Sequence, residues 1–332
     1  GQKRYWDDQF QRWMAFSSGQ QVKRSIIEHL ITRLNEQPAP VTFYFEAPTL
    51  KEKEVTTPGN PNFADQLVGG WMIANAGGTS RTIKRRSPLS ISALRPIHPL
   101  LGGMHEEPIS FDRSDRPDIH KVVVKDTDGR ELSSNEISEL LSGSDRSLRR
   151  KWIPKDKNRR TSGLFIYDVA IDLRTLFCVS VNQLEPELTE ETIKDLKTQG
   201  WFETRNVFGE CLVAPKERRE KIIPALSHAL INWRILTNQS RTFSPMETLA
   251  VAIGQNANKV TDAIRAKLNQ DGEKPVAQPI VDDSIDDVNV FVSLAGAGYF
   301  VTNVESPDAL DSAERRLIDL ITEFDFDNQI PS

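Results

Sequence analysis

Segments with β-strand character are spaced unevenly along this 332-residue chain. Apolar or alternating runs begin near residues 41, 164, 175, 288 and 299, and long helical or irregular stretches separate them. A doubly wound fold needs strands that alternate regularly with helices, and this spacing does not provide them. We therefore expect an α+β fold, in which helices pack on an antiparallel sheet and long insertions extend from its loops.

Helical periodicity is clearest in residues 15–34, which read AFSSGQQVKRSIIEHLITRL. Apolar residues recur at helical spacing from Val22 to Leu34, and the prolines at 38 and 40 end the predicted helix. Further helices are predicted at 187–200, at 215–236, from a capping box that starts at Ser244, and after Ser306-Pro307.

Two regions between these helices have a different character. Residues 47–110 are rich in Pro, Gly, Ser and Thr and show little periodicity, which predicts a long irregular excursion. Near the C-terminus, VNVFVSL and YFVTNV are joined by AGAG at 295–298, which predicts a hairpin or a bulged strand pair.

The composition is that of a globular protein, with 38% hydrophobic and 27% charged residues. No apolar run approaches the roughly 18 residues that would span a membrane, so no membrane association is expected. The two cysteines, Cys178 and Cys211, are too few for a zinc site by themselves and do not form a disulfide framework. We expect a protein of the reducing cytoplasm.

Charge is distributed unequally around a net value of −5. Residues 81–160 contain 18 basic and 12 acidic side chains, whereas residues 271–332 contain 3 basic and 14 acidic ones. The basic part is suited to a polyanion and the acidic part to a basic neighbour. The alternative interpretation is that the basic and the acidic regions are two solvent-exposed faces of a soluble protein that bind no charged partner.

Two basic runs strengthen the first interpretation. The first, RTIKRRS at 81–87, contains Arg81, Lys84, Arg85 and Arg86. The second, at 146–160, holds eight basic residues and one acidic residue, and it includes Arg149, Arg150, Lys151 and Trp152. Cations beside an aromatic ring suit a surface that follows a nucleic-acid backbone and stacks on bases, although a solvated charged loop would have the same composition.

The start of the first helix also favours an anion. Ser18 and Gln21 form a predicted capping box, yet Lys23 and Arg24 follow where a helix usually carries acidic residues. A bound phosphate would resolve this mismatch. The alternative is that both cations extend into water at a cost of a few tenths of a kcal/mol.

Signatures of catalysis are weak. His98 and His105 flank HPLLGGMHEE, where Glu106 and Glu107 are possible partners, but the spacing matches no HExxH motif. GGTSRT at 77–82 lacks the lysine of a phosphate-binding loop. We expect a protein that is not an enzyme and that has no metal or other cofactor.

The segment SSGQQVKRSI resembles the Ser-Ser-Gln-x-x-Lys-Arg element near the N-terminus of crRNA-binding backbone subunits of type I CRISPR Cascade complexes, which belong to the RAMP superfamily; this chain carries an additional Gly19. GLFIYDVAIDL (163–173) is similar to the core strand of that family, and residues 229–252 are similar to its helix and following polar loop.

The resemblance implies a modified RRM or ferredoxin-like palm with finger and thumb insertions. On this chain the palm would comprise 161–326 with the N-terminal 15–46, the insertions would fall at 47–160, and the whole would be one elaborated domain. Such subunits polymerise head to tail along the crRNA beside other Cascade subunits, and they present the guide for pairing with target DNA.

The resemblance also implies contact residues. Guide phosphates would be held by Ser17, Ser18, Gln20, Lys23 and Arg24. A second contact would involve Asn238, Gln239, Ser240 and Arg241. Two other functions remain open: a RAMP-like endoribonuclease that uses His98 or His105 with a nearby carboxylate, and a self-assembling structural or filament protein.

Overall fold

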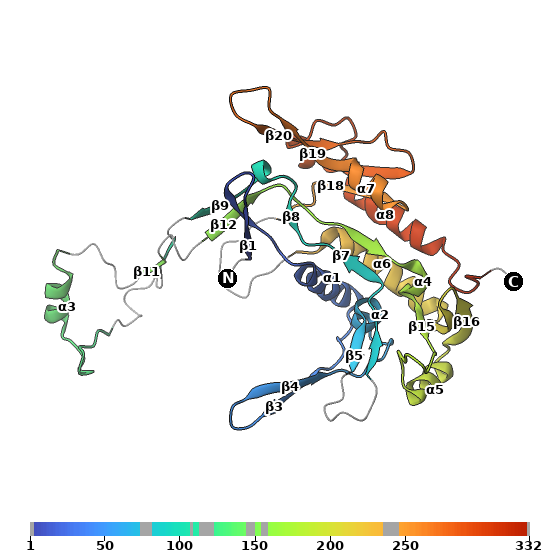
Figure 1. Cartoon of the computed structure of the whole chain (residues 1–332). Coiled ribbons are helices and arrows are strands. Elements are labelled where there is room, and N and C mark those ends of the chain that lie inside the picture. The colour runs from blue at the N-terminus through green and yellow to red at the C-terminus, as the bar shows by residue number, and fades with distance from the viewer. Residues whose placement is uncertain are drawn as a thin grey trace. The chain divides into compact units, whose positions relative to one another are not determined.

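The chain divides into two compact units in a computed structural model (Figure 1). Unit 1 comprises Gly1–Ala15 and Pro99–Leu164, and unit 2 comprises Phe16–His98 and Phe165–Ser332. The structure describes residues 3–73, 82–106, 109–112, 123–143, 150–153, 159–234 and 246–330, with the backbone alone at 52–54, 105–106, 109–112, 150–153 and 159–160.

The segment 47–160, where finger and thumb insertions are expected, is divided between the two units. Residues 47–98 belong to unit 2, together with the first helix and the C-terminal half of the chain. The reason is strand pairing, because strands in 89–96 hydrogen-bond to strands in 165–171.

Unit 1 is built mainly from antiparallel strand pairs. The pairs are β1 (Arg4–Asp7) with β2 (Arg12–Ala15), β9 (Gly102–Glu106) with β12 (Arg159–Gly163), and β10 (Ile109–Asp112) with β11 (Arg150–Ile153). The described residues of unit 1 also form the 3₁₀ turn η1 (Pro99–Leu101) and α3 (Ser134–Leu141). A capping box of Ser133 and Glu136 begins α3.

Unit 2 contains the other helices that the structure describes. They are α1 (Gly19–Leu34), α2 (Ala64–Gly69), α4 (Leu173–Leu176), α5 (Glu190–Thr198), α6 (Lys216–Asn232), α7 (Ala257–Ala263) and α8 (Ala309–Thr322), with the 3₁₀ turn η3 (Gly296–Gly298).

Strands of unit 2 also pair antiparallel, so the α+β prediction is confirmed. Two-stranded pairs are β3 (Thr42–Glu46) with β4 (Lys51–Thr56), β5 (Trp71–Ile73) with β6 (Ile83–Arg85), β7 (Leu89–Ile91) with β14 (Val169–Ile171), β8 (Arg95–Pro96) with β13 (Phe165–Ile166), β18 (Ala250–Gly254) with β21 (Val288–Val292), and β19 (Ile264–Asn269) with β20 (Val276–Val281). One sheet has three strands, in the order β15 (Cys178–Ser180), β17 (Gly209–Val213) and β16 (Phe202–Asn206).

The main hydrophobic core lies in unit 2, where α6 packs between α1 and α8. Val22, Ile26 and Leu30 of α1 are fully buried, as are Ile222 and Leu226 of α6. These positions are the apolar stripe that helical periodicity predicted for the first helix. The stripe fixes α1 to the core.

Several local predictions are confirmed. The first helix begins after Ser18 and ends at Asn35, whose left-handed conformation, with a φ of 55°, closes it. The predicted helix around Pro224 is α6, and the predicted last helix is α8.

Other local predictions are wrong. The capping box at Ser244 predicted a helix, but the chain from Met246 is irregular and then forms β18. AGAG at 295–298 forms η3 rather than a strand connection. The described part of 47–110 contains the strands β4 to β10 and the helix α2 rather than irregular chain. The strands β7, β8, β9 and β10 pair with strands at 150–171, and no local pattern in the sequence reveals such distant partners.

A histidine pair lies where α1, α6 and α8 meet. The rings of His29 and His228 stack with their centroids 5.4 Å apart, and His228 Nδ1 lies 2.9 Å from Glu314 Oε2. Burial lowers the pKa of His29, and the nearby His228, Arg234 and Arg33 lower it further. The folded state therefore favours neutral His29.

This packing predicts a pH dependence of stability. Below the ordinary histidine pKa of 6.5, the unfolded chain binds a proton at His29 that the folded chain resists. The His29 contribution is fully present above pH 6.5 and declines as the pH falls through the lowered folded-state pKa. We expect the urea midpoint to decrease from about pH 7.5 to about pH 5.5, and to decrease less in His29→Gln. An equal decrease in both proteins would contradict this prediction.

No helix within the described ranges is both long enough and apolar enough to cross a lipid bilayer.

Candidate functional site

The N-terminus of α1 is the part of the predicted site that the structure describes most completely. Ser18 is the N-cap, and its Oγ accepts a hydrogen bond from the Gln21 amide at 3.4 Å. No acidic residue lies in the first turn. The positive end of the helix dipole is therefore not offset by a carboxylate from that turn.

A second segment, residues 89–94, packs directly against this helix start. Ser17 and Leu94 exchange two backbone hydrogen bonds of 2.9 Å, which form an isolated antiparallel bridge. A Cβ atom placed on Gly19 would lie 3.0 Å from the Ser92 carbonyl oxygen and closer still to that of Ile91. Gly19 is thus where the helix approaches another backbone.

The two cations of the first helix have different surroundings. The Lys23 side chain is half-buried, and its Nζ donates to the Leu89 carbonyl at 3.4 Å. Burial lowers the pKa of Lys23, and the positive charge of Arg85 lowers it further. Arg24 is exposed and forms an i,i+4 ion pair of 2.8 Å with Glu28. Lys23 therefore belongs to a crowded cationic environment, and Arg24 extends toward solvent.

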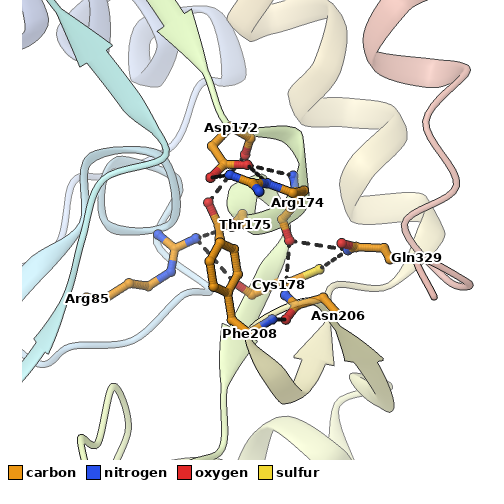
Figure 2. A network of polar contacts seen from close by, with 8 residues as sticks. All are labelled: Arg85, Asp172, Arg174, Thr175, Cys178, Asn206, Phe208 and Gln329. Atoms are coloured by element: carbon orange, nitrogen blue, oxygen red, sulfur yellow. Dashed lines mark hydrogen bonds and ion pairs between the residues drawn. The ribbon is translucent and has the colours of Figure 1, made fainter.

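Arg85 lies in the interior and not on the predicted RNA-binding surface. Its side chain is 4% exposed, and its guanidinium donates to the carbonyl oxygens of Leu67, Thr175 at 2.6 Å and Cys178 at 3.4 Å. Figure 2 shows the side chain directed at the segment that carries Thr175 and Cys178. Because these donors are already engaged, the interpretation of Arg85 as a phosphate ligand is corrected to a structural role.

The turn that Arg85 contacts is held in place by further polar contacts, which Figure 2 shows. The Arg174 carbonyl accepts from Asn206 Nδ2 at 3.1 Å and from Gln329 Nε2 at 3.2 Å. The Arg174 guanidinium itself pairs with Asp172 at 2.8 Å. Arg85 thus binds a turn that other polar side chains also hold in place.

The neighbours of Arg85 in the first basic run face the other way. Lys84 and Arg86 are exposed, as alternation along β6 requires when the residue between them points inward. They remain candidates for a phosphate contact close in sequence to segment 89–94. Gln20 is likewise exposed, and Ser17 and Ser18 are half-buried.

The remaining predicted contact residues are described only in part. Arg81, Arg149, Asn238, Gln239, Ser240 and Arg241 lie outside the described residues. Arg150, Lys151 and Trp152 form β11, which pairs with β10 in the register Ser110 to Trp152. The structure describes the backbone of β11 and not its side chains.

Comparison with known proteins does not assign the chain to a family. No protein-family model matches it, and no curated protein matches its sequence.

The structure also shows where the two cysteines and the candidate catalytic histidines lie. Cys178 and Cys211 are free and buried, and the pKa of the Cys178 thiol is raised by its hydrogen bond with Cys211 and by burial. His98 ends the first segment of unit 2, and His105 lies in β9 of unit 1. Among the described residues, no cluster of three His, Cys, Asp or Glu side chains has the arrangement of a metal site.

Sequence reasoning missed the part that segment 89–94 plays in this site. The segment contributes carbonyl groups at Leu89, Ile91 and Leu94, and every residue type carries a carbonyl. Ser92 has a side-chain role, because its Oγ donates to Asp168 Oδ2 at 3.3 Å and accepts from the Asp168 amide at 2.8 Å. No spacing in the sequence identifies such contacts.

Proposed function

We propose that this chain is a guide-RNA-binding backbone subunit of a type I CRISPR Cascade complex in the cytoplasm. Copies would stack head to tail along the crRNA, beside other Cascade subunits. Protein contacts to the sugar-phosphate backbone would fix the register, and base pairing of the guide would select the target DNA. The subunit would act without catalysis, metal or cofactor.

The observation that carries the proposal is the accumulation of positive charge at the start of α1. A helix N-terminus without an acidic residue in its first turn lies beside the half-buried Lys23, whose pKa is lowered by burial and by the positive charge of Arg85. Both effects favour a bound anion. A guide phosphate would offset the repulsion and accept hydrogen bonds from Ser18 and the first helical amides.

The finer fold is part of the same proposal. Unit 2, with its helices on antiparallel strands, would be a modified RRM or ferredoxin-like palm, and unit 1 would supply finger or thumb material. The acidic residues 271–332 would face the basic surface of the next copy in the row, as a heterologous interface allows.

The direct test is purification of the chain from cells that also express a CRISPR array. We expect the protein to retain guide RNA, with a ratio of absorbance at 260 to 280 nm above that of pure protein. Sequencing of the retained RNA should return repeat and spacer sequences. A chain that elutes free of RNA and has no salt-dependent affinity for added crRNA would overturn the proposal.

A double variant tests the site. Lys23→Ala with Arg24→Ala is expected to weaken binding of crRNA by about ten-fold, and to reduce the slope of log K against log salt by about 0.7 for each lost phosphate contact. Fluorescence anisotropy with labelled crRNA at several salt concentrations measures both quantities.

The matched control lies on α6 of the same unit. Lys216→Ala with Lys221→Ala removes two charges from an exposed helix face, and Lys216 has an i,i+4 partner in Glu220, as Arg24 has in Glu28. We expect this control to bind crRNA with nearly the affinity of the unaltered protein. Equal losses in the two double variants would indicate a general charge effect and would count against a site at α1.

A further inference from the structure

The β1–β2 hairpin of unit 1 displays two tryptophans that face each other. Trp6 and Trp13 are direct partners in the antiparallel register, and their rings meet edge to face with centroids 5.5 Å apart. Trp6 is 41% exposed and Trp13 is 44% exposed. Large aromatic side chains that stay this exposed as a pair usually mark a binding surface.

Other tryptophans whose side chains the structure describes have a different environment. Trp71, Trp201 and Trp233 are between 3% and 6% exposed. Their indole nitrogens donate to the Glu187 carbonyl, to Asn62 Oδ1 and to the Tyr167 hydroxyl respectively. Those three rings form part of the core of unit 2, and the hairpin pair does not have that role.

The hairpin is anchored below the tryptophans. Met14 is completely buried and Ala15 is 2% exposed, and β2 packs against β9 of the same unit. Arg12 Nη1 donates to the Pro99 carbonyl at 3.2 Å. A stacking surface held in this way loses little conformational entropy on binding, which favours affinity.

Charge on the tryptophan face selects the kind of ligand. Arg4 lies on this face, and its guanidinium carbon is 4.1 Å from the centre of the Trp13 ring. Asp7 and Arg12, which pair in register, alternate to the opposite face. A cationic ligand, such as a methylated ammonium group, would meet Arg4 and be repelled. A nucleotide offers an aromatic base to the rings and a phosphate to Arg4.

We propose that Trp6, Trp13 and Arg4 form a stacking site for an unpaired base of single-stranded nucleic acid. The site belongs to unit 1, whereas α1 belongs to unit 2, and it uses residues outside the Ser-Ser-Gln element. The inference rests on the proposed function, because it assumes that a nucleic acid is bound by this chain. The base would stack on an indole ring, and Arg4 would contact a flanking phosphate.

Binding of labelled oligouridine and oligothymidine to the full chain tests the site and distinguishes a guide RNA from a DNA strand. Trp6→Ala is expected to weaken binding of the preferred oligonucleotide by about ten-fold, and Trp6→Phe by less than about three-fold, because phenylalanine retains a stacking face. An oligonucleotide with abasic positions should bind the unaltered protein and Trp6→Ala equally, since it has phosphates but no bases.

The matched control is Phe208 of unit 2, which is 59% exposed and has the Arg174 guanidinium carbon 4.9 Å from its ring centre. Phe208→Ala removes an exposed aromatic ring beside an arginine and is expected to leave the affinity unchanged. Photocrosslinking of 5-iodouridine RNA to the unaltered protein should yield adducts at Trp6 or Trp13, which keeps the test decisive if Trp6→Ala does not fold.

The outcomes separate the two proposals. Unchanged affinity in Trp6→Ala, with weaker binding in the Lys23 and Arg24 double variant, would overturn the stacking site and leave the proposed function in place. Crosslinks confined to other residues would also overturn the stacking site. If the unaltered protein binds neither oligonucleotide nor crRNA, both proposals fail.

Discussion

Arg85→Met is expected to destabilise unit 2 by about 3 to 5 kcal/mol, because it leaves several buried carbonyl acceptors without their donor and each unsatisfied group costs about 1 to 3 kcal/mol. The carbonyl groups of Leu67, Thr175 and Cys178 would lose their donor and remain in the interior. Burial lowers the pKa of Arg85 to about 10, so the guanidinium is still charged at neutral pH and its hydrogen bonds are charge-assisted. Urea unfolding followed by tryptophan fluorescence measures the loss.

The neighbouring residue supplies the control for Arg85. Arg86 is exposed, and Arg86→Ala is expected to change the free energy of unfolding by no more than about 0.5 kcal/mol. Arg85→Lys keeps the charge but cannot reproduce the planar set of donors, and it is expected to be intermediate. Equal unfolding midpoints for Arg85→Met and Arg86→Ala would show that the guanidinium contacts do not stabilise the fold.

Arg85 also shows why the candidate site could be predicted only in part. The sequence RTIKRRS indicates cations, but the direction of each side chain depends on where β6 lies and on which segments surround it. The carbonyl partners of Arg85 come from residues 67 and 175–178, which are distant in sequence. Composition alone cannot distinguish a buried arginine from the exposed ones beside it.

The helices were predicted well because their determinants are local. The cap at Ser18 and the apolar spacing from Val22 act within one helix, and α1 forms where this pattern occurs. The helix α6 (Lys216–Asn232) likewise lies within the predicted range 215–236. Strand pairing is not local. Residues 250–254 form β18 because β21 offers a partner at Val288–Val292, and this pairing overrides the helix that a capping box at Ser244 predicted.

The glycine at 296 illustrates a different reason for failure. AGAG predicted the connection of a hairpin or a bulged strand pair, but a Cβ atom at Gly296 would meet the Leu249 carbonyl and the Val292 side chain. Gly296 is therefore required for close packing against the chain that leads into β18. A glycine that permits a turn and a glycine that permits close approach are indistinguishable in the sequence.

Gly19→Ala is expected to destabilise unit 2 by about 1 to 3 kcal/mol, because the added methyl group must displace the Ile91 and Ser92 carbonyls or the start of α1. Alanine is the best helix former, so helix propensity alone predicts the opposite sign. Thermal or urea unfolding decides between the two effects, and a variant as stable as the unaltered protein would contradict the close approach.

Gly298→Ala provides the control for Gly19, since no atom lies within 4 Å of the position of its Cβ and its φ is not in the left-handed region. We expect Gly298→Ala to change stability by no more than about 0.5 kcal/mol. The Gly19 variant also connects stability with the proposed function. A shift of α1 away from segment 89–94 would move Ser18 and the first helical amides, so binding of crRNA should weaken in Gly19→Ala under conditions where the protein remains folded, and it should not weaken in Gly298→Ala.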